Sequence, residues 1–382
     1  MMVAGNSAGD SSGRPTGGAA KAARLEPTLP GAYYTDPSIL AREWERIFQR
    51  SWLYAGREEQ VARPGDFVTL PVGNESVLIV RGDDGRLRAF YNVCRHRGSI
   101  LCAGETGSLK AIRCPYHAWT YGLDGGLKAA PNLRREEGFP KEEFSLHPVA
   151  LEVWRGGLFV NLEAGAVPPL ATALLGMPGR VGRYPLETLR VARHDVHDVE
   201  ANWKILIENY QECYHCPGVH PELCALVPLY GTGAVDNPGN GEVATFRAGA
   251  VTFTHTGTTR RPLFPGLTEQ ERRTFNGELI LPNTWMNFLP DFVQTRTLWP
   301  LSPTRTRFVT DWLFDPETMA RDDFDPQDAI AFTNLIAEQD WKVCEGVQRG
   351  VGSRAHRHGV FTPLEEELGH FKRWVVERLE GP

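Results

Sequence analysis

Two short loops, each carrying one cysteine and one histidine, constrain this chain more than any other feature. Cys94 and His96 stand two positions apart, Cys114 and His117 stand three apart, and 17 residues separate the pairs. Runs of β-branched and aromatic residues flank both pairs, so each loop is predicted to join two β-strands. Cysteine and histidine side chains gathered in this way predict a metal centre at one end of a small β-domain.

The mixture of ligands indicates which metal centre the loops form. In one type of [2Fe-2S] centre two thiolates hold one iron and two imidazoles hold the other, which raises the reduction potential. Tetrahedral zinc also accepts two cysteines and two histidines, but zinc fingers usually take like residues from the same loop. We therefore expect an iron–sulfur centre held by Cys94, His96, Cys114 and His117, with zinc as the alternative.

A length of 382 residues exceeds what one hydrophobic core usually organises, which predicts two domains. The first is expected at 29–165, where helical spacing at 37–52 precedes short strand-like runs and Asp84-Gly85 is a strong hairpin signal. Proline, glycine and alanine then dominate around 167–185. The predicted strands of this antiparallel β-domain are 68–72, 76–80, 87–93, 109–113 and 157–162.

The second domain is expected at 186–382, where strand-like runs come first and helical runs last. This order predicts an α+β domain in which helices pack on an antiparallel sheet, in a helix-grip-like arrangement. A helix predicted at 202–215 should be ended or distorted by Pro217-Gly218. The other predicted strands are 189–201, 242–255, 284–290, 292–301 and 306–314, and the later helices are 326–350 and 365–379.

Charge and composition narrow the classes of partner. A net charge of −6 without a basic stripe argues against nucleic acid, and the sequence shows no membrane span or secretion signal. Seven cysteines without a paired framework favour a reducing cytoplasm. Residues 1–28, rich in glycine, serine and alanine, are predicted to be a disordered tail.

A second cluster of metal-binding residue types lies in the second domain. Glu212 and His215 are three residues apart, and His220 follows five residues later. A regular helix would aim the two histidines about 140° apart, but a break at Pro217-Gly218 would let His220 turn back toward His215. Two imidazoles and one carboxylate would form a site for Fe(II) with open positions.

The carboxylate of this site is harder to choose from spacing. Among the downstream acids, Asp340 differs because it lies on a predicted helix beside Trp341, where an acid near apolar neighbours needs a partner. The other candidates, mostly in a polar turn, are Asp311, Asp322, Asp323, Asp325 and Asp328.

The stretches CRHRGSILCAG and CPYHAWTYGLDGGL resemble the Rieske signature of the aromatic-ring-hydroxylating oxygenase α-subunit family. The resemblance implies that Cys94 and Cys114 bind one iron and His96 and His117 the other. It also favours Asp340 as the third ligand of the mononuclear iron, beside His215 and His220. The stretch ENYQECYHCPGVHP resembles the branch of glycine betaine, choline and carnitine monooxygenases.

Further roles follow from this resemblance alone. Glu212 is expected to bridge a Rieske histidine of one subunit to the iron site of its neighbour, which implies a homotrimer. Asn209 is expected near the iron-site water. The resemblance also implies O2 as the cosubstrate and a separate NAD(P)H-dependent flavin/iron–sulfur reductase as the source of electrons. The lack of a dinucleotide-binding glycine motif in the chain agrees with an external reductase.

The same branch implies a small quaternary ammonium substrate that is N-demethylated or hydroxylated. Aromatic faces attract such cations, and Trp285, Phe288 and Tyr230 are candidates, although each is equally explained as a core residue. Arg296 and Arg305 are candidates for binding a substrate carboxylate, without a distinguishing context. The alternatives are a hydroxylase or demethylase of an aromatic or other organic acid, and an electron carrier without oxygenase activity.

Overall fold

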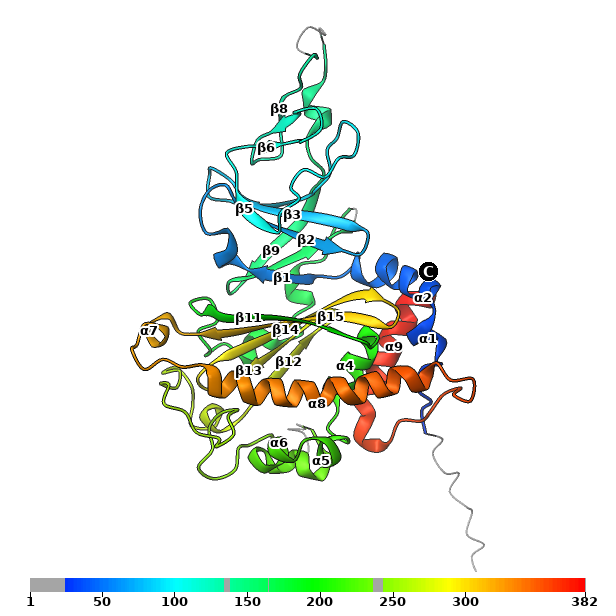
Figure 1. Ribbon diagram of the computed structural model, residues 1–382, viewed down its shortest axis with the longest axis vertical. Coiled ribbons are helices and arrows are strands. Elements are labelled where there is room, and N and C mark those ends of the chain that lie inside the picture. The colour runs from blue at the N-terminus through cyan, green and yellow to red at the C-terminus, as the bar shows by residue number, and fades with distance from the viewer. Residues whose placement is uncertain (1–24, 134–137, 164, 236–242, 382) are drawn as a thin grey trace, which may run out of the picture.

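The computed structural model describes residues 25–133, 138–163, 165–235 and 243–381 (Figure 1). Most of the tail predicted at 1–28 lies outside these residues. Its last part is paired, because Thr28 N–H donates to Gly359 O over 3.1 Å and Phe361 N–H donates to Glu26 O over 2.8 Å. Glu26 and Thr28 are therefore part of the folded structure, so the predicted tail does not extend to residue 28.

The first half of the chain is an antiparallel β-domain. After helices α1 (Ala32–Thr35) and α2 (Pro37–Glu43) and a π-helix (Trp44–Phe48), a seven-stranded sheet forms in the order β1-β10-β9-β4-β3-β2-β5. Its strands are β1 (Leu53–Arg57), β2 (Asp66–Val72), β3 (Glu75–Arg81), β4 (Leu87–Tyr91), β5 (Thr106–Ser108), β9 (Pro148–Trp154) and β10 (Gly157–Asn161). The predicted hairpin at Asp84-Gly85 is confirmed: Gly85 has φ of 76° and joins β3 to β4.

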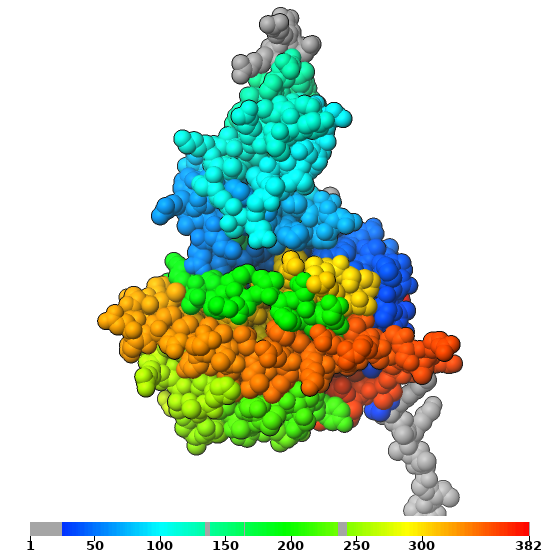
Figure 2. Space-filling model, in the orientation of Figure 1, coloured from blue at the N-terminus to red at the C-terminus, as the bar shows by residue number. Residues whose placement is uncertain are grey.

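A smaller sheet extends this domain at the far end of the molecule. It consists of β6 (Ile112–Arg113), β7 (Thr120–Tyr121) and β8 (Leu127–Ala129), and Figure 1 shows it well away from the second domain. Only the end of the strand predicted at 109–113 forms, as β6. The space-filling view shows this end as a narrow projection above a broader base (Figure 2).

The second half confirms the predicted α+β class. A five-stranded antiparallel sheet has the order β11-β15-β14-β13-β12. Its strands are β11 (Arg190–Val199), β12 (Asn276–Ile280), β13 (Thr284–Phe288), β14 (Val293–Ser302) and β15 (Arg305–Phe314). Helix α8 (Gln327–Val351) runs across one face of the sheet, and α4 (Trp203–Gln211) and α9 (Glu366–Glu380) lie beside it (Figure 1). The short helices are α3 (Met177–Arg180), α5 (Cys216–Val219), α6 (Pro221–Leu226) and α7 (Pro316–Met319).

The prediction of a strand at 242–255 is wrong. Within its described part the only pairing is a single bridge from Thr245 to Thr274. Gly249 takes φ of 81°, and the Thr254 hydroxyl donates to Thr258 O over 2.9 Å, so the chain turns repeatedly. The apolar side chains that alternate here pack in a core cluster beside α8 instead of forming one face of a sheet.

The two halves share one hydrophobic core. A single cluster contains Val77 and Ile79 of β3 together with Trp203 of α4 and Phe371 of α9. A buried ion pair strengthens this junction, since Lys204 Nζ lies 2.6 Å from Glu43 Oε1 and neither side chain is exposed. The Cys/His loops and α5 lie at opposite ends of this continuous structure (Figure 1).

Candidate metal centres

The Cys94 and Cys114 loops meet at the tip of the first domain. Both thiols are free and buried, whereas His96 is exposed and His117 is half-buried. The two imidazole rings lie edge to face with centroids 4.7 Å apart, and His96 stacks on Trp119 at 4.8 Å. The structure therefore brings together all four predicted ligands, with sulfur on the inside and nitrogen toward the surface.

Each loop is a tight turn closed by a backbone hydrogen bond to the carbonyl of its cysteine. Ala118 N–H donates to Cys114 O over 3.1 Å, and Gly98 N–H donates to Cys94 O over 3.0 Å. Burial raises the pKa of the Cys114 thiol, but hydrogen bonds from the Tyr116 and His117 backbone outweigh it, so the pKa lies below its usual value. This environment favours the thiolate, which is the form that binds metals.

Two observations show that these side chains fit an iron–sulfur cluster. His117 Nδ1 is buried and has no hydrogen-bond partner among the described residues, which suits a metal ligand. A single zinc ion would need its donors within about 4 Å of one another. In the described part of the chain, the only set of three or more such donor atoms within 4.8 Å lies elsewhere, at His215, His220 and Asp340.

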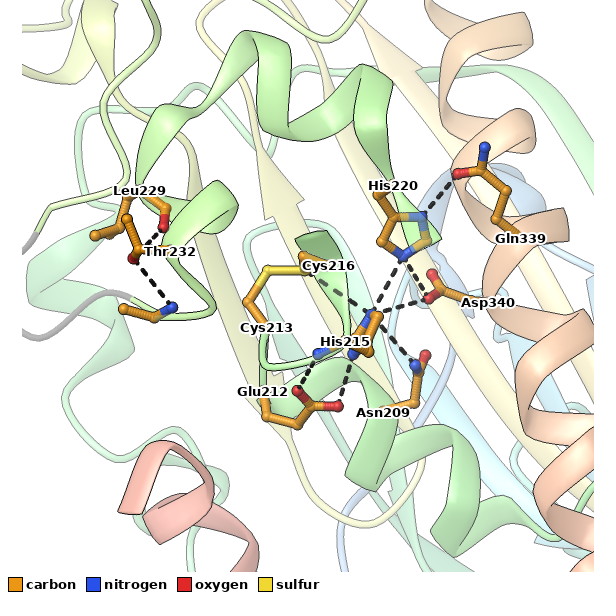
Figure 3. Close-up of a disulfide and its surroundings, with 11 residues drawn as sticks. Asn209, Glu212, Cys213, His215, Cys216, His220, Leu229, Thr232, Gln339 and Asp340 are labelled. Atoms are coloured by element: carbon orange, nitrogen blue, oxygen red, sulfur yellow. Dashed lines mark hydrogen bonds and ion pairs between the residues drawn. A yellow bond between two sulfur atoms is a disulfide. The ribbon is translucent and has the colours of Figure 1, made fainter. Parts of the chain in front are cut away.

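That second set lies between α5, α6 and α8 (Figure 3). His220 Nε2 is 2.8 Å from Asp340 Oδ1, His215 Nε2 is 3.4 Å from the same oxygen, and the two Nε2 atoms are 3.2 Å apart. Ligands at right angles around an ion with bonds of about 2.1 Å lie about 3 Å apart. The three atoms therefore fit one face of a metal ion, the arrangement of non-haem Fe(II) sites.

Neighbouring side chains orient both imidazoles. Gln339 Oε1 lies 2.7 Å from His220 Nδ1, while Gln339 Nε2 donates to Glu222 Oε2 over 3.1 Å. Because a carboxylate can only accept, the amide nitrogen must face Glu222 and the amide oxygen must face His220. His220 Nδ1 is therefore protonated, and its Nε2 lone pair faces the site. Gln339 was not predicted, and only its position before Asp340 could have indicated it.

Glu212 holds His215 in the same way. Its Oε1 lies 2.6 Å from His215 Nδ1, and its Oε2 accepts the His215 backbone N–H over 3.1 Å. Burial lowers the pKa of His215, but hydrogen bonds with Asp340 and Glu212 outweigh it and raise the pKa to about 9. Burial raises the pKa of Asp340, yet its histidine partners bring it below the usual value. A metal ion held by the three side chains would take the place of the proton that His215 otherwise shares with Asp340.

The helix before this site ends earlier than predicted. Helix α4 stops at Gln211, and Glu212 has extended dihedral angles of −131° and 160°. The Glu212 carboxylate bonds to the His215 backbone, which competes with helix formation, so Pro217 is not the residue that ends the helix. Pro217 instead lies in the first turn of α5, where proline is tolerated. The helix predicted at 202–215 is therefore too long at its C-terminal end, and Glu212 and His215 do not share a regular helix face, although their side chains do meet.

A disulfide that was not expected borders the iron ligands. Cys213 and Cys216 are bonded, and Cys216 Sγ lies 3.9 Å from His215 Nε2 (Figure 3). Asn209 Nδ2 lies 3.4 Å from the same nitrogen, which places Asn209 at the site as predicted. The other downstream acids are elsewhere: Asp311 pairs with His194, Asp323 with Arg321 and Asp328 with Arg261.

A cavity of about 120 Å³ adjoins the three ligands. Tyr230 lines it, as predicted, but Trp285 lies behind Tyr210 and borders a separate smaller cavity. Phe288 lines neither cavity; it packs in the core against Tyr184 at 5.0 Å, so its prediction as a pocket residue is wrong. The aromatic residues that line the cavity but were not predicted are Tyr210, Phe253, Phe275 and Phe332.

Comparisons with known proteins agree with both centres. Residues 51–149 match the Rieske [2Fe-2S] domain, and residues 186–381 match the catalytic domain of the ring hydroxylating alpha subunit. The glycine betaine monooxygenase oxygenase subunit of Pseudomonas aeruginosa is 31% identical over 92% of this chain and 89% of its own length. The carnitine monooxygenase oxygenase subunit of Acinetobacter baumannii is 34% identical over 86% of each chain. The crystal structure of the quaternary ammonium Rieske monooxygenase CntA matches 93% of this chain and 96% of its own, with 29% identity and a TM-score of 0.74.

The chain belongs to the Rieske non-haem iron oxygenases of the ring-hydroxylating α-subunit family. Its cofactors are therefore a [2Fe-2S] cluster and a mononuclear iron, and it uses O2. Among the described residues, no helix has both the length and the apolar character needed to cross a membrane.

Proposed function

We propose that this chain is the oxygenase component of a system that N-demethylates or hydroxylates a small quaternary ammonium compound. The observation that carries the proposal is a single cavity that joins the face formed by His215, His220 and Asp340 to a group of aromatic side chains. Electrons would come from a separate NAD(P)H-dependent flavin/iron–sulfur reductase.

The metal ligands in this proposal are those whose geometry fits. Cys94 and Cys114 hold one cluster iron, His96 and His117 hold the other, and His215, His220 and Asp340 hold the mononuclear iron. When bound, the cluster supplies single electrons and the mononuclear iron activates O2. Gln339 and Glu212 keep the lone pairs of the two imidazoles directed at the metal position.

The cavity wall suits a trimethylammonium group. The ring centroids of Phe253 and Phe275 are 4.9 Å apart, and those of Phe253 and Phe332 are 5.9 Å apart, so three aromatic rings form one continuous wall. Each aromatic face contributes about 0.5 to 2 kcal/mol to binding a desolvated cation. Relatives named for glycine betaine, carnitine and choline oxidation support this substrate class, as do CntA complexes with L-carnitine and γ-butyrobetaine.

Electron transfer in this proposal runs between subunits of a homotrimer. The Rieske loops and the iron ligands lie at opposite ends of one chain (Figure 1), so a neighbouring subunit is better placed to deliver the electron. Glu212, which already bonds to His215, would accept a hydrogen bond from a Rieske histidine of that neighbour. A CntA structure is described as revealing inter-subunit electron transfer, which supports this arrangement.

The test is reconstitution with a generic reductase, NADH and O2. We expect three irons per chain and release of formaldehyde, or formation of a hydroxylated product, from at least one of glycine betaine, carnitine, γ-butyrobetaine and choline. Two irons per chain would instead indicate an electron carrier. Full iron content with turnover of aromatic or other organic acids alone would replace the quaternary amine with that substrate class.

A further inference from the structure

Arg296 is a buried charge that forms no salt bridge among the described residues, and the carboxylate that attracts it from a distance, Asp340, is a proposed iron ligand. It lies on β14, is only 7% exposed and borders both cavities beside the iron ligands. Its guanidinium donates to Thr333 O over 3.0 Å and lies over the Phe308 ring, but it forms no ion pair with any described residue. Its Nε is buried and has no hydrogen-bond partner among those residues. Burying an unpaired charge is costly, so a partner for Arg296 is expected.

Two other arginines are buried among the described residues, and each also has one guanidinium nitrogen without a partner, Arg57 Nε and Arg261 Nη2. Arg296 differs from both in how the rest of its charge is satisfied and in its place at the cavity. Arg261 forms ion pairs with Asp291 and Asp328. Arg57 also pairs with no carboxylate in the described part of the chain, but its guanidinium donates to three backbone carbonyls at 2.8 to 3.1 Å. It borders neither of the two cavities beside the iron ligands. The charges of Arg57 and Arg261 are therefore satisfied within the fold. Arg296 has only one hydrogen-bond acceptor among the described residues, Thr333 O, and lines the cavity.

A second donor without a partner lies on the same face of β14. Gln294 is two residues from Arg296 and fully buried, and it lines the same cavity. Tyr210 Oη donates to Asn287 Oδ1 over 2.9 Å, and Asn287 Nδ2 donates to Gln294 Oε1 over 3.1 Å. These hydrogen bonds fix the orientation of the Gln294 amide, with Oε1 as an acceptor. The donor Nε2 then has no partner among the described residues.

We propose that Arg296 and Gln294 form a carboxylate-binding end of the substrate cavity, so that the substrate is a zwitterion with a quaternary ammonium group and a carboxylate. The inference rests on the proposed function and narrows it. A carboxylate is an acceptor-only anion, so it satisfies the buried Arg296 and Gln294 donors and supplies the missing negative charge. The aromatic wall of Phe253, Phe275 and Phe332 binds the other end of the same molecule.

This arrangement discriminates between substrates that share the trimethylammonium group. Choline carries a hydroxyl where glycine betaine carries a carboxylate, so binding choline would leave the Arg296 charge buried and unpaired. A site built for a charged partner rejects a ligand that lacks it much more strongly than a site built from apolar contacts. We expect carboxylate-bearing substrates to bind at least about 30-fold more tightly than choline.

The test measures binding to the iron-loaded protein by calorimetry, in a matched set of ligands. Glycine betaine, carnitine and γ-butyrobetaine have both groups, choline has only the ammonium, and the tert-butylacetate anion has only the carboxylate. Arg296→Met should weaken binding of every carboxylate ligand about 30-fold, and it should not weaken binding of choline because it removes the charge that choline leaves unpaired. Arg296→Lys should restore part of the loss. Arg305→Met is the control, because Arg305 is half-exposed and pairs with Asp198.

The outcomes separate the two claims. Choline binding as tightly as the best carboxylate ligand, or equal losses for all ligands in Arg296→Met, would overturn the carboxylate site and leave the quaternary ammonium function standing. Binding of tert-butylacetate as tight as that of glycine betaine, lost in Arg296→Met, would support the carboxylate site and contradict the quaternary ammonium function. Absence of binding by every carboxylate ligand and by choline would overturn both claims.

Discussion

Gln339 Oε1 lies 2.7 Å from His220 Nδ1, one residue before Asp340, whose Oδ1 lies 2.8 Å from His220 Nε2. Adjacent residues of α8 thus contact opposite nitrogens of one imidazole. The first holds the ring in the tautomer that leaves Nε2 unprotonated, and the second completes the proposed iron site beside it.

Gln339→Leu should therefore weaken iron binding although Gln339 is not a proposed ligand. We expect a loss of about 10- to 100-fold in Fe(II) affinity, with the [2Fe-2S] absorption unchanged. Competition with a chelator, followed by iron and sulfide analysis, measures this. Gln339→Glu keeps an acceptor facing His220 but sets a second carboxylate against Glu222, so it should restore only part of the affinity. The exposed Gln327→Leu, on the same helix, is the control; equal losses in Gln327→Leu and Gln339→Leu would contradict the orienting role.

Glu212→Gln should slow electron delivery while both metal sites remain occupied. The amide oxygen of glutamine can still accept from His215 Nδ1, but the amide nitrogen that replaces the second carboxylate oxygen cannot accept a hydrogen bond. We expect the rate of cluster reoxidation in a single turnover to fall about 100-fold. Glu338→Gln makes the same charge change on the exposed face of α8 and should have no effect. An unchanged reoxidation rate in Glu212→Gln would show that the bridge is not needed.

Phe253→Leu tests the aromatic wall. Leucine keeps an apolar surface but removes the ring, so affinity for a trimethylammonium ligand should fall about 3- to 30-fold, whereas affinity for its uncharged tert-butyl analogue should change little. Calorimetry on the two ligands provides the comparison. Phe288→Leu is the matched control, because Phe288 lies in the core away from the cavity and should lower stability without changing affinity. Equal losses for both ligands in Phe253→Leu would indicate simple packing.

The metal ligands could be predicted because their signals are local. Cys94 with His96, and Cys114 with His117, are each contained in one turn, and His215 and His220 are separated by one short break. Asp340 could be selected because an acid beside Trp341 on an apolar helix needs a partner. The strand and helix predictions likewise succeeded where the hydrophobic period was regular, as in α8 and β15.

The substrate end of the site could not be predicted because its residues meet only in the folded chain. Phe253 comes from a loop that was predicted to be a strand, Phe332 from α8, and Gln294 from a central strand that is buried throughout most of its length. Each looks like an ordinary core residue in sequence. Trp285 and Phe288 looked equally suitable in sequence. Phe288 lies on the opposite face of β13 from Asn287, whereas Trp285 pairs with Arg296 but is covered by Tyr210.

The buried pair of Glu43 and Lys204 should dominate the stability of the junction between the two halves. Glu43→Ala leaves the Lys204 ammonium buried without a partner and removes the acceptor of Trp203 Nε1, 2.8 Å away. We expect a loss of about 3 to 5 kcal/mol in the free energy of unfolding, measured with urea. Glu45→Ala, two residues away and exposed, should change it by less than about 0.5 kcal/mol. A loss below about 1 kcal/mol in Glu43→Ala would mean that Lys204 finds another partner.

Glu208 should make stability depend on pH. Burial raises its pKa from 4.5 to about 7, although Tyr34 Oη donates to Glu208 Oε1 over 2.7 Å and opposes the shift. Because the folded state holds this proton more tightly than the unfolded state, its contribution is complete below about pH 4.5 and is lost as pH rises through about 7. The full shift corresponds to about 3 kcal/mol, and partial exposure lowers our expectation to about 2 kcal/mol.

Glu208→Gln isolates this contribution, because an amide of the same shape accepts from Tyr34 and does not titrate. Relative to the variant, the wild-type protein should lose about 2 kcal/mol of unfolding free energy between about pH 5 and about pH 8. Urea unfolding of both proteins at several pH values measures the difference, and subtraction cancels the other titrating groups. If the difference between the two proteins stays constant, or if the wild type gains stability as pH rises, Glu208 is ionised in the fold at all these pH values. The positive charge of Lys204, one turn earlier on α4, would then compensate the negative charge of Glu208.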